Sequence, residues 1–302
     1  MEFRTLLKGE SVNLLRSIFV DPGRPRPRAG WRIAIGFIVI MTVIGILAAA
    51  VDAIEIPFIE SFLWQLLAAL ILVGVARLLA RRIDRRAFRD YGLSWQPRHL
   101  TIGTLLGIAL VSLIFWVQLR LGWIAIGERL HNRYDVPFVA GWIGFVMRYG
   151  AVAVFEELFH RGFLITNLSE GLGGERPRPG LGCLVAALIF GVLHLTNENA
   201  TAIGAVNVTL LGLLFGMTYL WTGRLSLAIG LHFGWNFALG PGFGLPVSGY
   251  EPRVSLVLST TNDAELWTGG AFGPEGGLLT TIVLVASLTV FIAVRQIRRS
   301  EP

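Results

Sequence analysis

Six polar residues that could take part in catalysis lie inside otherwise apolar stretches of the sequence. They are Glu156, Glu157, Arg161, His194, His232 and Asn236. A carboxylate, two imidazoles and a carboxamide can supply a general base, a group that positions water or binds a metal, and hydrogen-bond donors for a developing negative charge. A single histidine or asparagine in such a stretch usually bonds only to a neighbouring helix, so the combination carries the argument.

The spacing of these residues predicts how their side chains are arranged on helices. Glu157 and Arg161 are four residues apart, which places them on one helical face as an ion pair. Glu156 points about 100° away from that pair and stays available for another task. His232 and Asn236 also stand four residues apart and share a face.

The composition indicates that these stretches cross a membrane. Of the 302 residues, 54% are hydrophobic and only 15% are charged, and the mean hydropathy is +0.64. Soluble domains contain roughly 45–50% apolar and about 25% charged residues, so an ordinary cytosolic enzyme is excluded. Disorder is excluded because too much apolar surface must be buried. Cys183 is the single cysteine, which excludes a disulfide scaffold.

Eight apolar stretches are long enough, or nearly so, to cross ~30 Å of hydrocarbon, which takes about 20 residues. They cover residues 31–51, 58–80, 100–121, 138–168, 181–195, 201–221, 225–239 and 277–297. The predicted fold is therefore all-α, a polytopic transmembrane helix bundle of about eight spans. At ~1.5 Å per residue, the catalytic candidates on three different spans lie about 12–21 Å from the same membrane face, near the middle of the bilayer.

These spans divide the chain into five expected regions. A basic cytoplasmic segment, 1–30, precedes the first three spans and their loops, 31–137. Spans four to seven, 138–240, carry all six polar residues. A Gly- and Pro-rich extracytoplasmic loop, 241–276, is too long for a structureless connection and suggests a cap or a re-entrant segment. The last span and a basic cytoplasmic tail form 277–302.

The positive charges predict the orientation of the chain in the membrane. Most of the 26 Lys and Arg residues fall in the N-terminal segment, in the loop after the second span and in the C-terminal tail, which share one side. By the positive-inside rule, both termini face the cytoplasm. The net charge of +6 therefore reflects topology and lipid contact, and we expect no nucleic-acid partner. Arg32, Arg148 and Arg161 lie within spans instead.

The three polar motifs resemble those of one known family. The run from Glu156 to Arg161 reads Glu-Glu-Leu-Phe-His-Arg and is similar to the Glu-Glu-x-x-x-Arg motif of the CPBP intramembrane proteases. Phe190 to His194 and His232 to Asn236 resemble that family's Phe-x-x-x-His and His-x-x-x-Asn motifs, in the same order. The resemblance covers about a third of the chain, 138–240, as a protease core. The family groups CAAX prenyl endopeptidases with bacteriocin-processing and bacteriocin-immunity proteins.

This resemblance implies an eight-helix bundle with a buried proteolytic site. By motif position, Glu156 would activate the attacking water and His194 would help to hold it. His232 and Asn236 would stabilise the oxyanion. The supporting residues that orient the site would be Glu157 and Arg161. These roles suit amide hydrolysis, because attack of water places negative charge on the carbonyl oxygen and preorganised donors stabilise that charge.

Two mechanisms remain open for such a site. Glu156, His194 and His232 could together bind zinc or another divalent metal and leave one coordination position open. The family is often named as metalloproteases and has also been described as glutamate-dependent and metal-free. The zincin motif His-Glu-x-x-His is absent from the sequence. The sequence therefore allows a metalloendopeptidase and a metal-free glutamate-type hydrolase equally.

Two other functions compete with proteolysis. The same residues could line a proton or ion path in a transporter, although no inverted repeat or pair of broken helices supports this. A non-catalytic scaffold or a bacteriocin-immunity protein could share the fold. We expect an intramembrane endopeptidase of a bacterial plasma membrane, in contact with membrane lipid and acting on a membrane-associated or prenylated peptide or protein.

Overall fold

The structure is a computed structural model that describes residues 18–21, 23–54, 58–174, 176–262 and 264–300; for residues 51–54, 58–64, 299 and 300 it describes the backbone alone. Much of the expected basic segment, residues 1–17, lies outside the described residues. The long helices are α2 (Ala29–Ile54), α3 (Phe58–Arg82), α4 (Pro97–Arg120), α5 (Phe138–Glu157), α7 (Pro179–Leu193), α8 (Ala202–Thr222), α9 (Ser226–Phe237) and α11 (Leu278–Ser300). The short helices are α6 (Thr166–Gly173) and α10 (Glu265–Thr268).

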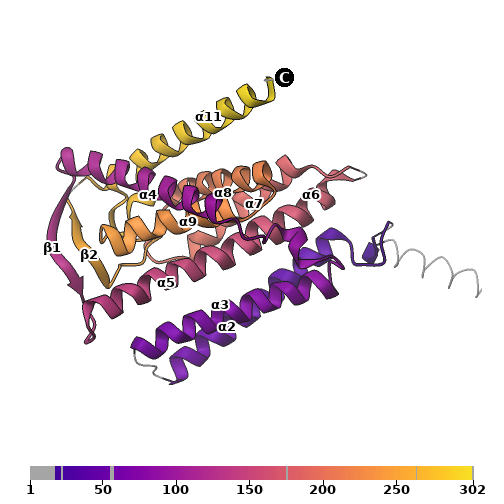
Figure 1. The fold of residues 1–302 in the computed structure, drawn as a ribbon, viewed down its shortest axis with the longest axis horizontal. Helices are drawn as coiled ribbons and strands as arrows, with labels where there is room; N and C mark the ends of the chain where they lie inside the picture. Colours follow the sequence, from indigo (N-terminus) through magenta and orange to yellow (C-terminus); the bar gives the residue numbers. More distant parts are fainter. Residues whose placement is uncertain (1–17, 22, 55–57, 175, 263, 301–302) are drawn as a thin grey trace, which may run out of the picture.

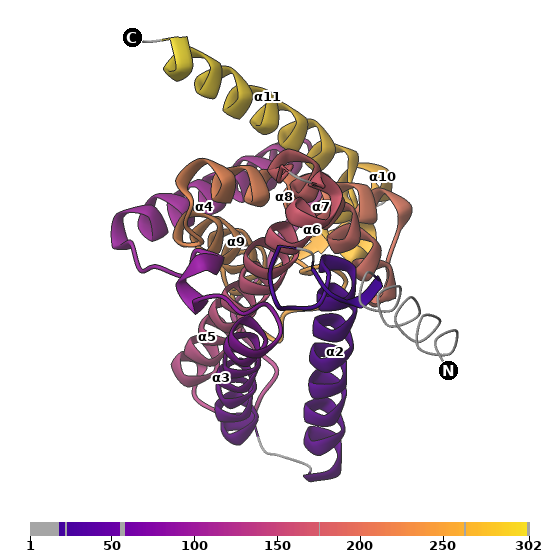
Figure 2. The same ribbon diagram turned by 90° about the vertical axis from the view of Figure 1, so that its right-hand side faces the viewer.

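These helices form one bundle with α5, α8 and α9 inside (Figure 1). The α2–α3 pair lies on one flank and α11 on the opposite flank (Figure 2). Two groups of buried apolar side chains fill the interior. One group packs α4, α5, α8 and α9 around Phe215 and Trp235, and the other packs α2, α3 and α7 around Phe159 and Phe163. The candidate site lies where these two groups meet.

One continuous rod runs through the bundle. The α5 helix continues into a π-helical segment, Leu158–Ile165, and then into α6. The π-helical segment starts directly after Glu157, and every residue in it is buried. A π turn holds more residues than an α turn, so it changes which side chains face the bundle interior beyond Glu157. Such turns occur mostly at functional sites.

Glycines bring α4 and α9 into direct backbone contact. A Cβ atom on Gly107 would collide with the Leu231 carbonyl oxygen, and one on Gly234 would collide with that of Thr104. Glycine inside a helix costs about 1 kcal/mol relative to alanine, and here it permits this close approach. The contact fixes α9, which carries His232, in the bundle.

At one end of the predicted all-α bundle, two connecting segments form a small antiparallel β-ribbon that the sequence did not indicate. Strand β1 (Ile124–Asn132) follows α4, and strand β2 (Val254–Thr261) lies within the region 241–276. The first residue of β1 pairs with the last residue of β2, and the last with the first. Figure 1 shows the ribbon across the ends of α4 and α5. The predicted loop 241–276 is therefore largely structured.

Six of the eight predicted spans correspond to helices, within the described residues, that are long and apolar enough to cross a membrane. They are Ala29–Ala50, Pro97–Arg120, Phe138–Gly173, Pro179–Thr196, Ala202–Thr222 and Leu278–Arg298. The predicted span 58–80 falls on α3, whose first seven side chains lie outside the description and whose remainder contains three arginines. The predicted span 225–239 is too short as a helix, because α9 ends at Phe237 and a π turn containing Pro241 follows. The polytopic helix bundle is confirmed, with fewer full-length spans than predicted.

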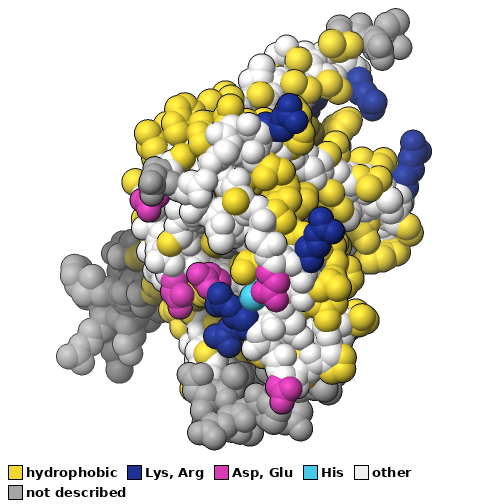
Figure 3. All heavy atoms as spheres, turned by 90° about the vertical axis from the view of Figure 1, so that its left-hand side faces the viewer, with side chains coloured by type: hydrophobic (Ala, Val, Ile, Leu, Met, Phe, Trp, Pro, Cys, Tyr) yellow, Lys and Arg dark blue, Asp and Glu magenta, His cyan; other side chains and the backbone are white. Residues whose placement is uncertain are grey.

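The outer faces of the helices are apolar. Leu70, Leu105 and Val290 are each more than 60% exposed, which suits contact with lipid. Charged side chains gather instead at the ribbon end (Figure 3), where Arg133 and Glu251 form an ion pair of 3.1 Å. Together with the six apolar helices, this distribution shows an integral membrane protein.

At the end of the bundle opposite the ribbon, a network of ion pairs and hydrogen bonds links several segments of the chain. It is here called the α6 network. Its members are Arg26, Arg32, Asp84, Arg86, Tyr91, Asn167 and Glu170. Glu170 of α6 accepts hydrogen bonds from three of these arginines at 2.8–3.0 Å. Asp84 accepts hydrogen bonds from the Tyr91 hydroxyl and the Asn167 amide, each at 2.7 Å. The network ties the chain before α2 and the end of α3 to α6.

Candidate active site

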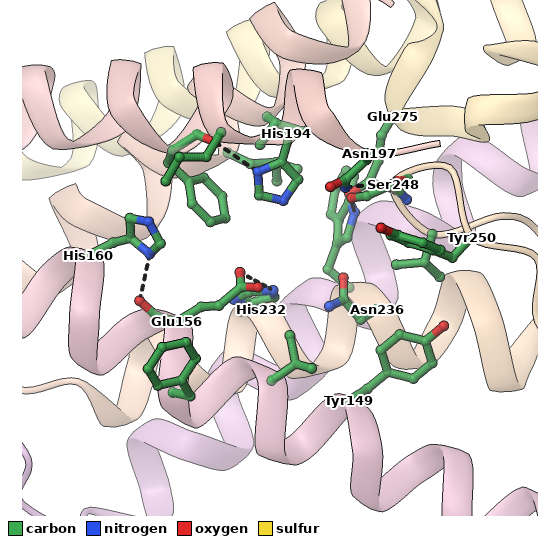
Figure 4. A pocket seen from close by; sticks show the side chains of 18 of the residues that line it. Tyr149, Glu156, His160, His194, Asn197, His232, Asn236, Ser248, Tyr250 and Glu275 are labelled. Carbon is green, nitrogen blue, oxygen red and sulfur yellow. Dashed lines mark hydrogen bonds and ion pairs between the residues drawn. The ribbon is translucent and has the colours of Figure 1, made fainter. Parts of the chain in front are cut away.

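A cavity of about 410 Å³ lies inside the bundle, and Glu156, His194, His232 and Asn236 all line it. They come from α5, from the turn after α7 and from α9 (Figure 4). Ligand pockets measure roughly 300–1,000 Å³, so the cavity can hold a short peptide segment. The structure thus brings together the four residues that the motifs singled out on three separate predicted spans.

Glu156 lies near the end of α5 with its carboxylate at the cavity. The side chain is 25% exposed, and its Oε2 lies 4.0 Å from His232 Nε2. No arginine among the described residues forms an ion pair with it. Its backbone carbonyl oxygen accepts a hydrogen bond of 2.9 Å from His160 Nδ1 on the next helical turn. The carboxylate therefore remains available, as the spacing predicts.

Glu157, by contrast, is fully buried and occupied on two sides. It accepts a hydrogen bond of 2.9 Å from Arg161, the ion pair that the spacing predicts. The same carboxylate oxygen accepts a second hydrogen bond of 2.8 Å from His232 Nδ1 on α9. Glu157 therefore fixes the orientation of the His232 ring and compensates the charge of Arg161.

Two phenylalanines enclose the Arg161 guanidinium. It lies 4.5 Å from the centroid of the Phe190 ring and 5.1 Å from that of Phe215, and it donates to the Gly212 carbonyl oxygen at 3.2 Å. Phe215 also stacks on the His232 ring at 5.1 Å. A buried cation is thus paired with a carboxylate and covered by aromatic faces, which stabilise it. Arg161 acts through its neighbours and does not line the cavity.

His194 has a defined tautomer. Its Nδ1 lies 2.8 Å from the Phe190 carbonyl oxygen, which can only accept, so Nδ1 carries the proton. The neutral ring then presents Nε2 as an acceptor toward the cavity (Figure 4). An acceptor in this position can hold a water molecule by one of its protons.

His232 and Asn236 occupy the wall that α9 contributes. Because Nδ1 of His232 donates to Glu157, its Nε2 is the nitrogen that faces Glu156 across 4.0 Å. Asn236 is 94% buried, and within the described part of the chain its carboxamide makes no hydrogen bond. The amide points into the cavity (Figure 4). Both side chains can therefore donate to a negatively charged oxygen in the cavity, His232 when its ring is protonated.

The comparison with known families agrees with this geometry. Residues 137–238 match the family described as type II CAAX prenyl endopeptidase Rce1-like. This matched segment is here called the CAAX protease domain. This domain contains all six polar residues that the sequence motifs singled out, and the resemblance to the CPBP and CAAX proteases is confirmed. No match is found among curated proteins. The family supports a protease that acts in a membrane.

Two residues of the CAAX protease domain contribute more than the sequence indicated. His160 lies inside the Glu-Glu-x-x-x-Arg run and lines the cavity, and the structure gives its Nε2 no hydrogen-bond partner within the described residues. Phe190 stands between three imidazoles, with ring centroids 4.8 Å from His160, 4.5 Å from His194 and 6.3 Å from His232. A histidine inside a recognised motif is the signal that could have identified His160.

Glu275, outside the CAAX protease domain, also lines the cavity. It is 97% buried and accepts hydrogen bonds from the Trp235 indole at 3.0 Å and from the backbone and hydroxyl of Ser248 at 2.6 and 2.8 Å. Trp235 lies between His232 and Asn236 on α9. Glu275 therefore ties the segment that follows the CAAX protease domain to the helix carrying the proposed oxyanion donors.

The donor set does not fit the proposed metal site. Glu156 Oε2 and His232 Nε2 approach each other to 4.0 Å, and His194 lines the same cavity from the turn after α7. Among the residues described, no three His, Cys, Asp or Glu side chains are placed to hold one ion. The combination Glu156, His194 and His232 is therefore not supported as a ligand set, and the mechanism below uses the side chains alone.

Proposed function

We propose that the protein is an intramembrane endopeptidase in which Glu156 acts as a general base on a water molecule. His194 holds that water through its Nε2. The substrate carbonyl then lies over α9, where His232 and Asn236 donate to the oxyanion. The observation that carries this proposal is the convergence of an unpaired carboxylate, an acceptor imidazole and two oxyanion donors on one cavity.

The reaction follows from the hydrogen bonds of the site. Glu156 takes a proton as the water oxygen attacks the carbonyl carbon, and the carbonyl oxygen becomes negative. For Nε2 of His232 to donate, the ring must carry two protons, and the buried Glu157 carboxylate behind it compensates that charge. Glu156 then gives its proton to the amine that leaves. Donors held in place before the reaction stabilise the oxyanion without reorganisation.

The substrate that we propose is a membrane-associated protein or peptide, and a prenylated C-terminal peptide is the first to test. We propose a bacterial plasma membrane as the location, with both termini in the cytoplasm. The positive charges of the N-terminal segment and of the loop after α3 support this orientation. The ribbon end then faces the other side.

The test compares Glu156→Gln with the matched variant Glu198→Gln, an exposed carboxylate on the loop after His194. Each purified protein is mixed in detergent with an internally quenched prenylated peptide. Loss of a general base lowers kcat by roughly 10²–10⁴-fold, while Glu198→Gln should cleave like the parent. Glu156→Gln should keep the parent's melting temperature, because it leaves no charge unpaired. Full turnover by Glu156→Gln would contradict the assigned role, and an inactive parent would favour a scaffold.

A further inference from the structure

Glu275 is a carboxylate at the cavity that the mechanism above does not use. It is 97% buried, and within the described part of the chain no arginine or lysine forms an ion pair with it. A carboxylate buried without a counter-charge is costly unless hydrogen-bond donors surround it. Because an ionised carboxylate only accepts, it can also gather several donors at one point.

The Glu275 carboxylate joins two walls of the cavity. Its Oε1 accepts from the Trp235 indole on α9 at 3.0 Å, and its Oε2 accepts from the backbone and hydroxyl of Ser248 at 2.6 and 2.8 Å. Ser248 belongs to a segment, residues 247–250, that lines the cavity. Figure 4 shows Glu275 and Ser248 on the side of the cavity away from His160. One carboxylate thus holds α9 and the 247–250 segment together.

The same junction reaches the turn that carries His194. The Ser248 carbonyl oxygen accepts a hydrogen bond of 3.0 Å from the Asn197 amide, and the Asn197 backbone donates to the His194 carbonyl oxygen at 3.2 Å. Ser248 has a φ of 47°, a region that residues with a Cβ rarely adopt, so surrounding bonds must hold it there. A chain of contacts therefore runs from Glu275 to the residue that holds the water in the proposed mechanism.

The end of α9 needs a second restraint, because Asn236 lies in its last turn. The regular helix ends one residue later, and a π turn follows. The close backbone contact with α4 restrains only the face of α9 that carries Gly234. Trp235 lies about 100° around the helix from Gly234. Its bond to Glu275 therefore restrains the rotation of α9 that a contact along one face leaves free.

Glu275 is itself held from the opposite direction. Asn207 of α8 is fully buried and donates to the backbone carbonyl oxygens of Glu275 and Gly277 at 2.8 and 2.9 Å. The Thr281 hydroxyl of α11 donates to the Asn207 side chain at 2.7 Å. The carboxylate thus extends from a point that is fixed between α8 and the start of α11.

We propose that Glu275 is a positioning residue for hydrolysis, which sets the oxyanion donors on α9 relative to the water held by His194. This inference rests on the proposed endopeptidase function and extends its machinery beyond the CAAX protease domain, which ends at residue 238. Glu275 acts through Trp235 and Ser248 and takes no proton in the reaction. A misplacement of about 1 Å can cost roughly 10²-fold in rate, so loss of the junction acts on kcat.

The test compares Glu275→Gln with the matched control Glu265→Gln, an exposed carboxylate of α10 in the same connecting segment. Glutamine keeps the size of the side chain, but one of its two accepting positions becomes a donor, so it cannot serve Trp235 and Ser248 together. With the quenched prenylated peptide in detergent, kcat of Glu275→Gln should fall roughly 10–100-fold and KM should stay within a few fold. Glu265→Gln should cleave like the parent.

Two further variants separate positioning from a loss of stability. Trp235→Phe keeps the ring and removes only the N–H donor, so it should also lower kcat, including in the case that Glu275→Gln does not fold. In a double-mutant cycle, Glu275→Gln should lower kcat less in the Asn236→Ala background than in the parent, because part of its effect passes through Asn236.

A parent-like kcat in folded Glu275→Gln or in Trp235→Phe would overturn the inference. So would losses of kcat that multiply independently in the cycle, since these assign Glu275 to the fold alone. Cleavage by the parent is scored separately: a parent that cleaves no peptide refutes the proposed function and this inference with it, whereas an active parent with an equally active Glu275→Gln refutes only this inference.

Discussion

Two buried ionic clusters lie along the same rod, and they differ in what they leave open. In the α6 network, Glu170 accepts from three arginines and Asp84 from two neutral donors, so protein donors engage each carboxylate. The second cluster, here called the cavity cluster, consists of Glu156, Glu157, Arg161, His232 and Asn236, and protein donors engage its Glu157 in the same way. Glu156 and Asn236 instead point their polar groups into the cavity.

The pKa shifts in the α6 network indicate that this network stabilises the fold. Burial alone would lower the pKa of Arg86, yet the carboxylates of Glu170 and Asp84 raise it above its ordinary value. Burial, reinforced by the Asp84 carboxylate, raises the pKa of the Tyr91 phenol. Arg86 therefore stays charged and Tyr91 stays neutral at physiological pH. A cluster whose groups hold each other's charge state stabilises the fold, while a cluster with open groups can receive a substrate.

Substitution of Glu157 should give the largest loss of stability and activity. This residue belongs to the cavity cluster, but its carboxylate is fully bonded, like the carboxylates of the α6 network. In Glu157→Gln, Arg161 loses its counter-charge in a buried site and His232 loses the negative charge of its hydrogen-bond acceptor. Breaking a buried ion pair costs about 3–5 kcal/mol, so both yield and melting temperature should fall, and activity with them. Size-exclusion profiles and thermal unfolding measure this, and Glu198→Gln is the control. A parent-like melting temperature would contradict the pairing argument.

Two asparagines, one in each cluster, should separate chemistry from stability. Asn236→Ala removes a proposed oxyanion donor and should lower kcat by roughly 10²–10³-fold, with KM changed only a few fold. Asn167→Ala removes a donor to Asp84 and should lower the melting temperature with kcat close to the parent's. Steady-state kinetics and thermal unfolding of both variants are compared. If the Asn236→Ala variant instead has a lowered melting temperature and a normal kcat, Asn236 contributes to helix packing and not to catalysis.

Asp84→Asn should weaken the α6 network alone. The substitution keeps a hydrogen-bond acceptor but removes the charge facing Arg86 at 3.3 Å and Arg32 at 3.9 Å. Hydrogen bonds to charged groups are worth about 1.5–3 kcal/mol, so the free energy of unfolding should fall by roughly that amount. Asp135→Asn, an exposed carboxylate, serves as the control. A large loss of kcat in correctly folded Asp84→Asn protein would show that the two clusters are coupled.

The smallest perturbation tests whether the two ends of the bundle face opposite sides of the membrane. With Cys183 replaced, a single cysteine at Arg85, beside the α6 network, should be shielded from an impermeant thiol reagent in intact cells. A cysteine at Glu251, beside the ribbon, should react. Both positions are exposed, so neither change should alter activity. The reverse labelling pattern would overturn the proposed orientation.

Much of the helical fold could be predicted from the sequence because the length of an apolar stretch is a local property. The ribbon could not. The run of β1 contains Gly127, Glu128 and Arg129, which do not resemble a strand, and its partner β2 lies more than a hundred residues away. Pairing between such distant segments depends on how α4 and α5 are placed.

The same distinction between local and long-range contacts applies to the candidate site. The Glu157–Arg161 pair was predictable because both residues lie on one helix. The bond from His232 to Glu157 joins residues 75 positions apart and depends on the packing of α9 against α5. Glu275 was missed for that reason too, since its partner Trp235 lies 40 residues earlier in the chain. Residues that act across helices need the bundle before their role can be inferred.

The rod from Phe138 to Gly173 has a consequence for hydrophobic mismatch. Its 36 residues measure ~54 Å, against ~30 Å of hydrocarbon. Even a tilt of ~40°, at the upper end of the usual range, leaves it longer than the apolar layer. Both ends therefore project into headgroups or water, while Glu156 lies 18 residues from one end and 17 from the other. A thicker or thinner bilayer covers or uncovers the two ends first, and the proposed catalytic carboxylate keeps its central depth.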